Sequence, residues 1–212
     1  MAATKTRVRD AEATKSRILK AAKQEFAKLG LGGARVDVIA ECADANKRMI
    51  YHYFGSKEEL FKAVLEDAYL DIRAAERSLE LDQLPPHQAL ETLVRFTWQY
   101  YLDNPEFVRL VNSENLHQAR HLKSSERTKL STRGIVSAVQ NILQRGQAEG
   151  TFRPNIDPVQ LNITIAALGF YYLNNRWTGS FLFERDFMSP QALDARLNHN
   201  IDTIMRLVAK EQ

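Results

Sequence analysis

The side chains best suited to chemistry lie between residues 46 and 57 of this 212-residue chain, where basic, aromatic and amide groups alternate. An arginine or lysine can donate two hydrogen bonds to the edge of guanine, and an apolar side chain can contact the methyl group of thymine. We assign these roles to Lys47, Arg48, Met49 and Tyr51. The segment therefore predicts a surface that reads the bases of duplex DNA.

One short helix must position these groups. Asn46 is a suitable N-cap, because its side-chain oxygen can accept a hydrogen bond from the first turn of a helix over residues 47–53. On that helix Ile50, Tyr53 and Phe54 share an inward face, since they are three and four residues apart. The basic side chains are then left on the outer face and the flanks.

A second short helix precedes it, because apolar residues repeat at helical spacing from Val36 to Ala43. Asp44-Ala45 separates the two helices, and Gly55 supplies the turn that follows them. The pair predicts a helix-turn-helix.

The next helix begins with a capping box, Ser56-Lys57-Glu58-Glu59. In this motif Ser56 and Glu59 each satisfy one free backbone N–H group. Lys57 lies at the helix N-terminus, which itself attracts phosphate. We therefore expect Lys57 to bind the DNA backbone.

The segment Arg35-Val-Asp-Val-Ile-Ala-Glu-Cys-Ala-Asp-Ala-Asn-Lys-Arg-Met-Ile-Tyr-His-Tyr-Phe-Gly-Ser-Lys-Glu-Glu-Leu60 resembles the DNA-binding signature of the TetR family of transcriptional regulators. It departs from the family pattern at three positions. Asp44 replaces a turn glycine, Asn46 a serine and Arg48 a small residue. Aspartate tolerates the left-handed backbone region of a turn, and we expect Arg48 to change the sequence that is read.

The resemblance implies a homodimer whose recognition helices enter successive major grooves, about 34–36 Å apart, of a near-palindromic operator on double-stranded DNA. It also implies a repressor that is released by a small-molecule inducer and requires no cofactor. It places Tyr51, His52, Tyr53 and Lys57 at positions that contact the backbone or nearby bases, and the full set of expected DNA-binding residues is Arg35, Asn46, Lys47, Arg48, Met49, Tyr51, His52, Tyr53 and Lys57. Among these, His52, Tyr53 and Lys57 are the expected phosphate contacts.

The whole chain has helical periodicity and no alternating strand pattern, so we predict an all-α protein. An N-terminal three-helix, helix-turn-helix domain over residues 1–57 should precede a helical bundle over residues 58–212 for ligand binding and dimerisation. Its first helix should cover residues 11–29, behind a basic arm with Lys5, Arg7 and Arg9 that follows the minor groove. The other expected helices are a connecting helix at 56–79 and those at 87–102, 105–121, 125–149, 158–177 and 190–210.

Charge is distributed unevenly: residues 1–57 hold twelve Lys/Arg and six Asp/Glu, a net of +6, whereas the whole chain carries +3. The basic end should therefore face phosphate. No apolar run reaches the roughly 20 residues that span a bilayer, and we expect a cytoplasmic protein with no membrane partner. Cys42 is the only cysteine, which excludes an internal disulfide.

The region from residue 93 to residue 177 mixes aromatic and polar side chains, as a small-molecule pocket between bundle helices does. An ordinary aromatic core is the alternative. The candidate ligand-binding residues are Trp98, Tyr101, Phe107, Asn112, Glu114, Asn115, His117, His121, Phe170, Tyr171, Asn174 and Trp177.

The last two expected helices each carry an apolar stripe. Either stripe can be monomer core, but in the resembled family the corresponding helices pair with their two-fold mates, and isologous dimers are the commonest oligomers. The candidate interface residues are Leu161, Ile165, Leu168, Gly169, Tyr172, Leu193, Leu197, Ile201, Ile204, Met205 and Val208.

Two alternatives to a ligand-responsive repressor remain at this point. Glu114, His117 and His121 lie at i, i+3 and i+7 of an expected helix, and Glu-x-x-His is a spacing that metal sites use, so a metal-responsive regulator is one alternative. A helical enzyme or protein-interaction module is the other. Since the chain has no Gly-rich phosphate loop, Gly-x-Ser-x-Gly or His-Glu-x-x-His motif, we predict that it is not an enzyme.

Overall fold

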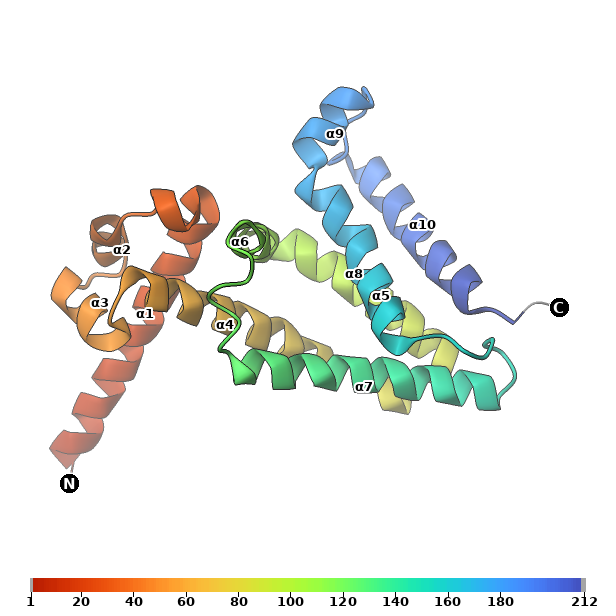
Figure 1. Cartoon of the computed structure of the whole chain (residues 1–212), viewed down its shortest axis with the longest axis horizontal. Coiled ribbons are helices and arrows are strands. Elements are labelled where there is room, and N and C mark those ends of the chain that lie inside the picture. Colours follow the sequence, from red (N-terminus) through yellow and green to blue (C-terminus); the bar gives the residue numbers. More distant parts are fainter. Residues whose placement is uncertain (1, 211–212) are drawn as a thin grey trace. The chain divides into compact units, whose positions relative to one another are not determined.

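The computed structural model describes residues 2–210, and the side chains of residues 10–210. Within that range the secondary structure is helical, apart from one isolated β-bridge between Phe152 and Ala209 (Figure 1). The predicted all-α fold is confirmed. None of the described helices is both long enough and apolar enough to cross a membrane.

The chain divides into two compact units. Unit 1 comprises Met1–Tyr69 and Arg109–Thr128, and unit 2 comprises Leu70–Val108 and Lys129–Gln212. The helices that begin in unit 1 are α1 (Ala2–Gly33), α2 (Val36–Cys42), α3 (Lys47–Phe54), α4 (Lys57–Arg77) and α7 (Glu126–Ala148). Those that begin in unit 2 are the 3-10 helix η1 (Leu81–Gln83), α5 (Pro86–Asp103), α6 (Pro105–Leu116), α8 (Pro158–Asn174), α9 (Arg176–Leu182) and α10 (Pro190–Val208).

Unit 1 is built on a small apolar core. Phe26 of α1 packs its ring edge-on against Phe61 of α4, with centroids 5.1 Å apart and an interplanar angle of 73°. Ile18 of α1, Ile39 of α2 and Ile50 of α3 are fully buried. Because one apolar face of each short helix is buried, the opposite face of α3 is held toward solvent.

The first helix is longer than expected. It begins at Ala2 rather than at residue 11 and continues to Gly33, although Gly30 has a positive φ of 67° inside it. Because the backbone of Gly30 is not helical, it separates two helical segments within Ala2–Gly33, and the end of the first helix predicted at residue 29 is confirmed. The predicted minor-groove role of Lys5, Arg7 and Arg9 concerns side chains that lie outside the described residues.

Unit 2 is built around α5, which contacts α8, α10 and η1, while α8 and α10 also contact each other. Its core draws apolar side chains from α5, α7, α8 and α10, including Leu90, Val139, Ile165 and Ile204. Gly169 allows α8 to approach α5 closely, because a Cβ atom there would lie 3.2 Å from the ring of Tyr101. Four of the helices that begin in this unit, α5, α6, α8 and α10, begin at proline, which is well suited to a first helical position.

Two expected helices end earlier in the structure. The helix expected over residues 105–121 stops at Leu116, and Gln118 and Ala119 both take a left-handed φ of 57°. The helix expected over residues 158–177 divides at Asn175 into α8 and the short α9. The sequence gives no sign of these breaks, because the apolar periodicity continues through them and neither position contains glycine or proline.

The assignment of the two apolar stripes to a dimer interface is wrong for their central residues. Leu161, Ile165, Ile204 and Val208 are at most 4% exposed within a single chain, and Gly169 is buried as well. Leu168, Ile201 and Met205 are partly buried against the same core. Since these residues already pack α8 and α10 onto α5, they leave little surface for a second copy.

Candidate nucleic-acid interface

The exposed helix α3 is held by caps at both ends. The Asn46 side chain accepts a hydrogen bond from the Met49 N–H at 2.9 Å, as predicted for an N-cap. At the other end the Gly55 N–H donates to the Tyr51 carbonyl at 2.8 Å, and Gly55 has a φ of 82°. A residue with a Cβ atom is strained at that φ, so glycine is the natural choice there.

The turn between α2 and α3 depends on Asp44, whose φ is 47°. The left-handed conformation predicted for this aspartate is therefore confirmed. Arg17 of α1 supports the turn, because its Nε donates to the Ala43 carbonyl at 3.1 Å. Sequence analysis missed Arg17, whose contact lies 26 residues away along the chain.

The start of α4 is only partly the expected capping box. The Glu59 N–H donates to the Ser56 hydroxyl at 3.1 Å, as predicted. The Ser56 N–H, however, donates to the Phe54 carbonyl at 3.1 Å and does not need the Glu59 side chain. Lys57 extends back to α1, where its Nζ donates to the Gly32 carbonyl at 3.4 Å.

The outer face of α3 presents the residues that were expected to read bases. Lys47, Arg48, Tyr51 and His52 are exposed, and Tyr51 is 47% exposed. Met49, Tyr53 and Lys57 are half-buried. The predicted set also includes Asn46 and Arg35. The Asn46 side chain caps α3, and Arg35 is exposed just before α2. The members on α3 itself, Lys47, Arg48, Met49, Tyr51, His52 and Tyr53, place hydrogen-bond donors and apolar groups on one short helix.

Arg35 and Lys47 share a carboxylate that sequence analysis did not single out. Arg35 donates to Asp37 through Nε at 3.2 Å and Nη2 at 2.7 Å, and Lys47 Nζ lies 4.0 Å from Asp37 Oδ2. The hydrogen bonds from Arg35 lower the pKa of Asp37 to about 2. Asp37 thus carries a negative charge where a phosphate would otherwise pair with the same cations. The sequence feature that could have indicated this ion pair is an aspartate two residues after an arginine at the start of a helix.

The twelve candidate ligand residues are divided between the two units. The members that lie in unit 1 are Asn112, Glu114, Asn115, His117 and His121, and those in unit 2 are Trp98, Tyr101, Phe107, Phe170, Tyr171, Asn174 and Trp177. In unit 2, Trp98, Tyr101 and Phe107 are at most 6% exposed, whereas Tyr171 and Trp177 are 65% and 74% exposed. The buried ones pack on one another, with the Tyr101 and Phe107 rings stacked 5.9 Å apart, as the aromatic-core alternative predicted.

The proposed metal ligands are not arranged to bind a metal, because the helix that should align them ends at Leu116. Glu114 instead folds the following loop: its Oε1 accepts from the N–H groups of His121 and Leu122, and its Oε2 lies 2.7 Å from His121 Nδ1. Over the described residues, no three His, Cys, Asp or Glu side chains are grouped as metal ligands. The described residues therefore do not contain the metal site expected from Glu114, His117 and His121.

A capped, exposed helix that follows a tight turn on a three-helix scaffold defines a helix-turn-helix DNA-binding protein. The family described as "Bacterial regulatory proteins, tetR family" matches residues 18–64, which contain this motif. The "Tetracyclin repressor-like, C-terminal domain" matches residues 86–204, more than half of the chain. The chain belongs to the TetR family of bacterial transcriptional regulators, as the sequence predicted.

Individual relatives agree with this assignment. The HTH-type transcriptional repressor NicS of Pseudomonas putida is 42% identical over 189 residues, which cover 89% of each chain. The HTH-type transcriptional repressor SCO4008 of Streptomyces coelicolor is 43% identical over 108 residues, or 51% of this chain and 53% of the relative. A tetR-family regulatory protein from Rhodococcus RHA1 shares the fold, with a TM-score of 0.72 at 19% identity over 94% of this chain and 98% of that chain.

Proposed function

We propose that this chain is a homodimeric repressor that binds a near-palindromic operator in the cytoplasm and is released by a small molecule bound in unit 2. The exposed, doubly capped helix α3 with its basic N-terminal end carries the proposal. NicS, which is similar along most of its length, is named as a transcriptional repressor. Regulation in this scheme requires binding alone, with no cofactor and no catalytic step.

The residues of α3 have separate roles in the proposal. Lys47 and Arg48 lie in its first turn, the part of a recognition helix that reaches base edges, and Arg48 is suited to guanine. Met49 and Tyr51 would contact thymine methyl groups. His52, Tyr53 and Lys57 would hold the DNA backbone, with Arg35 added if it exchanges Asp37 for a phosphate.

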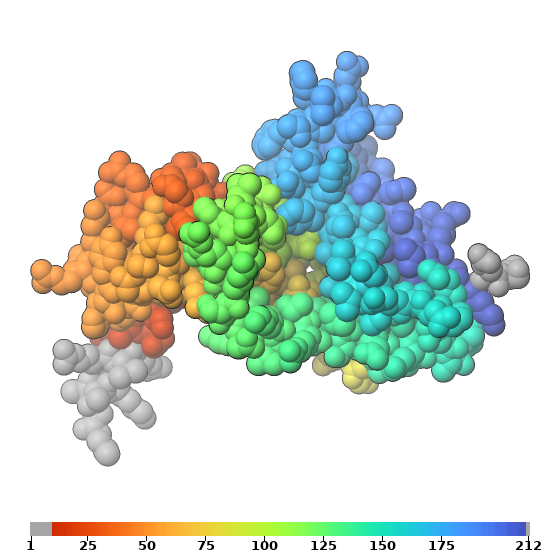
Figure 2. All heavy atoms as spheres, viewed as in Figure 1, coloured from red at the N-terminus to blue at the C-terminus, as the bar shows by residue number. Residues whose placement is uncertain are grey.

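A different face of α8 from the one first predicted supports the dimer. Val159, Ile163 and Tyr171 are spaced at multiples of four residues and are 45%, 52% and 65% exposed. In α9, Trp177 and Phe181 are 74% and 82% exposed, and this helix forms the blue tip at the top of Figure 2. Exposed apolar side chains grouped on neighbouring helices can mark interaction sites, and burial against a two-fold mate would remove them from water.

The dimer proposal is tested by replacing Ile163 with aspartate and measuring the mass in solution by sedimentation. Ile163→Asp should shift the population toward the monomer, because an unpaired charge would be buried at the interface. Leu130→Asp changes a similarly exposed apolar residue, 58% exposed on α7, and serves as the control. A dimer that is equally stable in both variants contradicts the proposed face.

An inducer can release the operator only if it binds the DNA-incompetent state more tightly than the competent one. A coupling free energy of about 1–3 kcal/mol would lower DNA affinity roughly 5- to 150-fold. The helix α4 begins beside the DNA-binding turn and ends in unit 2, so it is the covalent element through which we expect this coupling to pass.

The proposed DNA binding is tested by selecting tight duplexes from a random pool and then measuring affinity across a salt series. We expect a selected sequence with two related half-sites, and a logarithm of the binding constant that falls linearly with the logarithm of salt concentration, because phosphate contacts release counterions. Weak, salt-independent binding to every duplex would contradict the proposal.

A further inference from the structure

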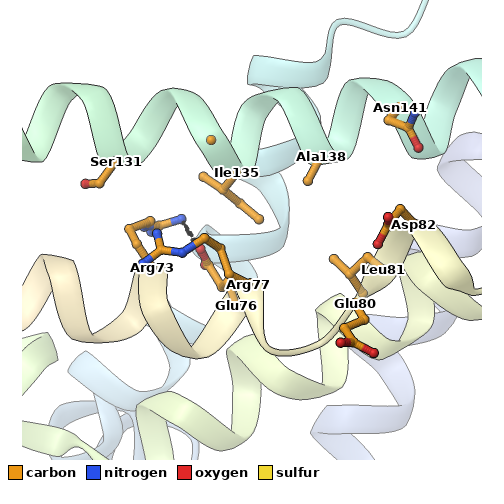
Figure 3. A pocket seen from close by; sticks show the side chains of 11 residues that line it. Arg73, Glu76, Arg77, Glu80, Leu81, Asp82, Ser131, Ile135, Ala138 and Asn141 are labelled. Carbon is orange, nitrogen blue, oxygen red and sulfur yellow. Dashed lines mark hydrogen bonds and ion pairs between the residues drawn. The ribbon is translucent and has the colours of Figure 1, made fainter.

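A half-open cavity of about 230 Å³ lies within unit 2, between the C-terminal part of α4, η1 and α7. Figure 3 shows the side chains that line it: those of Arg73, Glu76 and Arg77 come from α4, and those of Ser131, Ile135, Ala138 and Asn141 from α7. None of them belongs to the aromatic set that the sequence suggested for ligand binding. The cavity is smaller than the roughly 300–1,000 Å³ of drug-sized sites, so it suits a molecule of about one ring.

Arg73 is the chemically distinctive group of this cavity. Its side chain is only 12% exposed, and its Nη1 donates to both oxygens of Glu76, at 2.9 and 2.7 Å. Its Nε is shielded from solvent and has no hydrogen-bond partner in the described part of the chain. Buried donors are normally satisfied, so this N–H indicates that an acceptor is missing.

The geometry of a guanidinium narrows the choice of acceptor. Glu76 is held by Nη1, so a ligand would meet the rest of the guanidinium where Arg73 lines the cavity. Guanidinium edges match planar carboxylates, and such charge-assisted hydrogen bonds are about twice as strong as neutral ones. A carboxylate is therefore the acceptor that Arg73 would hold best.

The rest of the lining fits the body of a small acid. Ile135, Ala138 and Leu81 provide apolar surface next to the arginine. In the view of Figure 3, Asp82 lies at the opposite end of the row from Arg73, beside Asn141 of α7. The cavity thus favours a ligand with a hydrogen-bond acceptor at the Arg73 end, an apolar body in the middle and a hydrogen-bond donor at the Asp82 end.

We propose that this cavity binds a small organic acid, with the carboxylate on Arg73 and a one-ring apolar body against Ile135 and Ala138. The binding site is inferred from the geometry of the cavity alone. Its use as the inducer site rests on the proposed function, because Arg73 lies on α4, the helix that begins at Lys57 beside the DNA-binding turn.

Three probes of one size test the chemistry: benzoate, benzyl alcohol and benzylamine, titrated into the full-length protein by calorimetry or ligand-observed NMR. We expect saturable benzoate binding in the millimolar range or tighter, and at least about tenfold weaker binding of the alcohol and the amine, since neither can pair with Arg73 as a charge-assisted acceptor. The absence of benzoate binding, or equal binding of benzylamine, would overturn the proposal.

Gly134 provides a matched pair of variants that locates the site. It lines the cavity, and a Cβ atom built on it meets no atom within 4 Å. Gly134→Phe should therefore fill the cavity and abolish benzoate binding, while Gly134→Ala, which also improves helix propensity, should leave affinity within about twofold. If benzoate binds Gly134→Phe as tightly as it binds the wild type, it binds outside this cavity, and the proposed location of the site is wrong.

Arg73→Lys keeps the positive charge but removes Nε, and it should weaken benzoate at least about tenfold relative to wild type. If Arg73→Lys fails to fold, the two Gly134 variants still decide whether benzoate binds in this cavity.

Operator binding in the presence of benzoate separates the two proposals. If benzoate binds the cavity but operator affinity does not change, the binding site stands and its link to regulation is wrong. If no duplex binds, the proposed function fails, and the titrations on the DNA-free protein still decide the cavity.

Discussion

The surface around α3 in unit 1 and the cavity of unit 2 hold their positive charges in opposite ways. On the DNA-facing side of unit 1, the side chains of Arg35 and Lys47 are 69% and 54% exposed, and they share a carboxylate that is itself 43% exposed. In unit 2, Arg73 is 12% exposed and bound to Glu76, and Arg145 donates to the carbonyl oxygens of Leu81 and Leu84 at 2.9 and 2.6 Å.

This difference separates two kinds of recognition. Exposed cations keep their hydration, so they can exchange one partner for a phosphate, and their interactions weaken as salt increases. Buried cations have already lost hydration and are stable only with well-placed acceptors. Unit 1 should thus respond strongly to salt, and unit 2 to the shape and hydrogen-bonding groups of a ligand.

The largest expected effect separates the scaffold of unit 1 from its charged surface. Ile50 is fully buried beneath α3, so Ile50→Ala should lower the free energy of unfolding by about 2–5 kcal/mol. Its neighbour Tyr51 is 47% exposed, and Tyr51→Ala should change stability by less than about 0.5 kcal/mol. Denaturant unfolding measures both. Equal losses would mean that the two faces of α3 are not distinct.

A second prediction concerns the buried pair of unit 2. Burial raises the pKa of Glu76 to about 7, against the opposing attraction of Arg73. A raised carboxyl pKa gives stability that is present below the unfolded value and is lost as pH rises through the folded one. Relative to Glu76→Gln, the wild-type protein should therefore lose about 2 kcal/mol of unfolding free energy between about pH 5 and pH 8.

Glu91→Gln is the control for this pH series, because it removes a carboxylate that is 31% exposed and binds Arg95, which is 49% exposed, at 2.7 Å. Exposed pairs contribute only about 0–1 kcal/mol. A pH dependence that survives in Glu76→Gln would assign the effect to another group.

A smaller effect is expected from Asp37, which pairs with Arg35 and Lys47 and, in the proposed function, would compete with phosphate for them. Asp37→Asn should strengthen DNA binding by about 0.5–1 kcal/mol at low salt and make the salt dependence steeper. Asp202→Asn removes a similar pair in unit 2, where Arg206 Nε lies 2.7 Å from Asp202, and should leave DNA affinity unchanged. Equal effects of both substitutions would mean that only the net charge matters.

Sequence patterns predicted the helix-turn-helix of unit 1 well because its features are local. The Asn46 cap, the positive φ of Asp44 and the Gly55 turn each depend on residues a few positions apart. The cavity of unit 2 joins residues 73–82 to residues 131–141, and no local pattern reports such a pairing. Arg73 and Glu76 do stand at i and i+3, but that spacing is usual on exposed helix faces, so it did not indicate burial.

The apolar faces of α8 show the same limit. This helix is apolar on several sides, and periodicity cannot decide which side faces the core. The stripe with Leu161 and Ile165 proved to be core, whereas Ile163 and Tyr171 are exposed. Only the positions of α5 and α10 determine the choice.

The central claim, that α3 reads DNA sequence from its first turn, is tested most directly by measuring the affinity of Arg48→Ala for the selected operator and for every single base-pair change in one half-site. We predict a loss of about 1–3 kcal/mol on the operator and a loss of preference at one base position, whereas Lys57→Ala should weaken all sequences alike. Arg48→Ala that weakens every duplex equally, or none, would contradict the account.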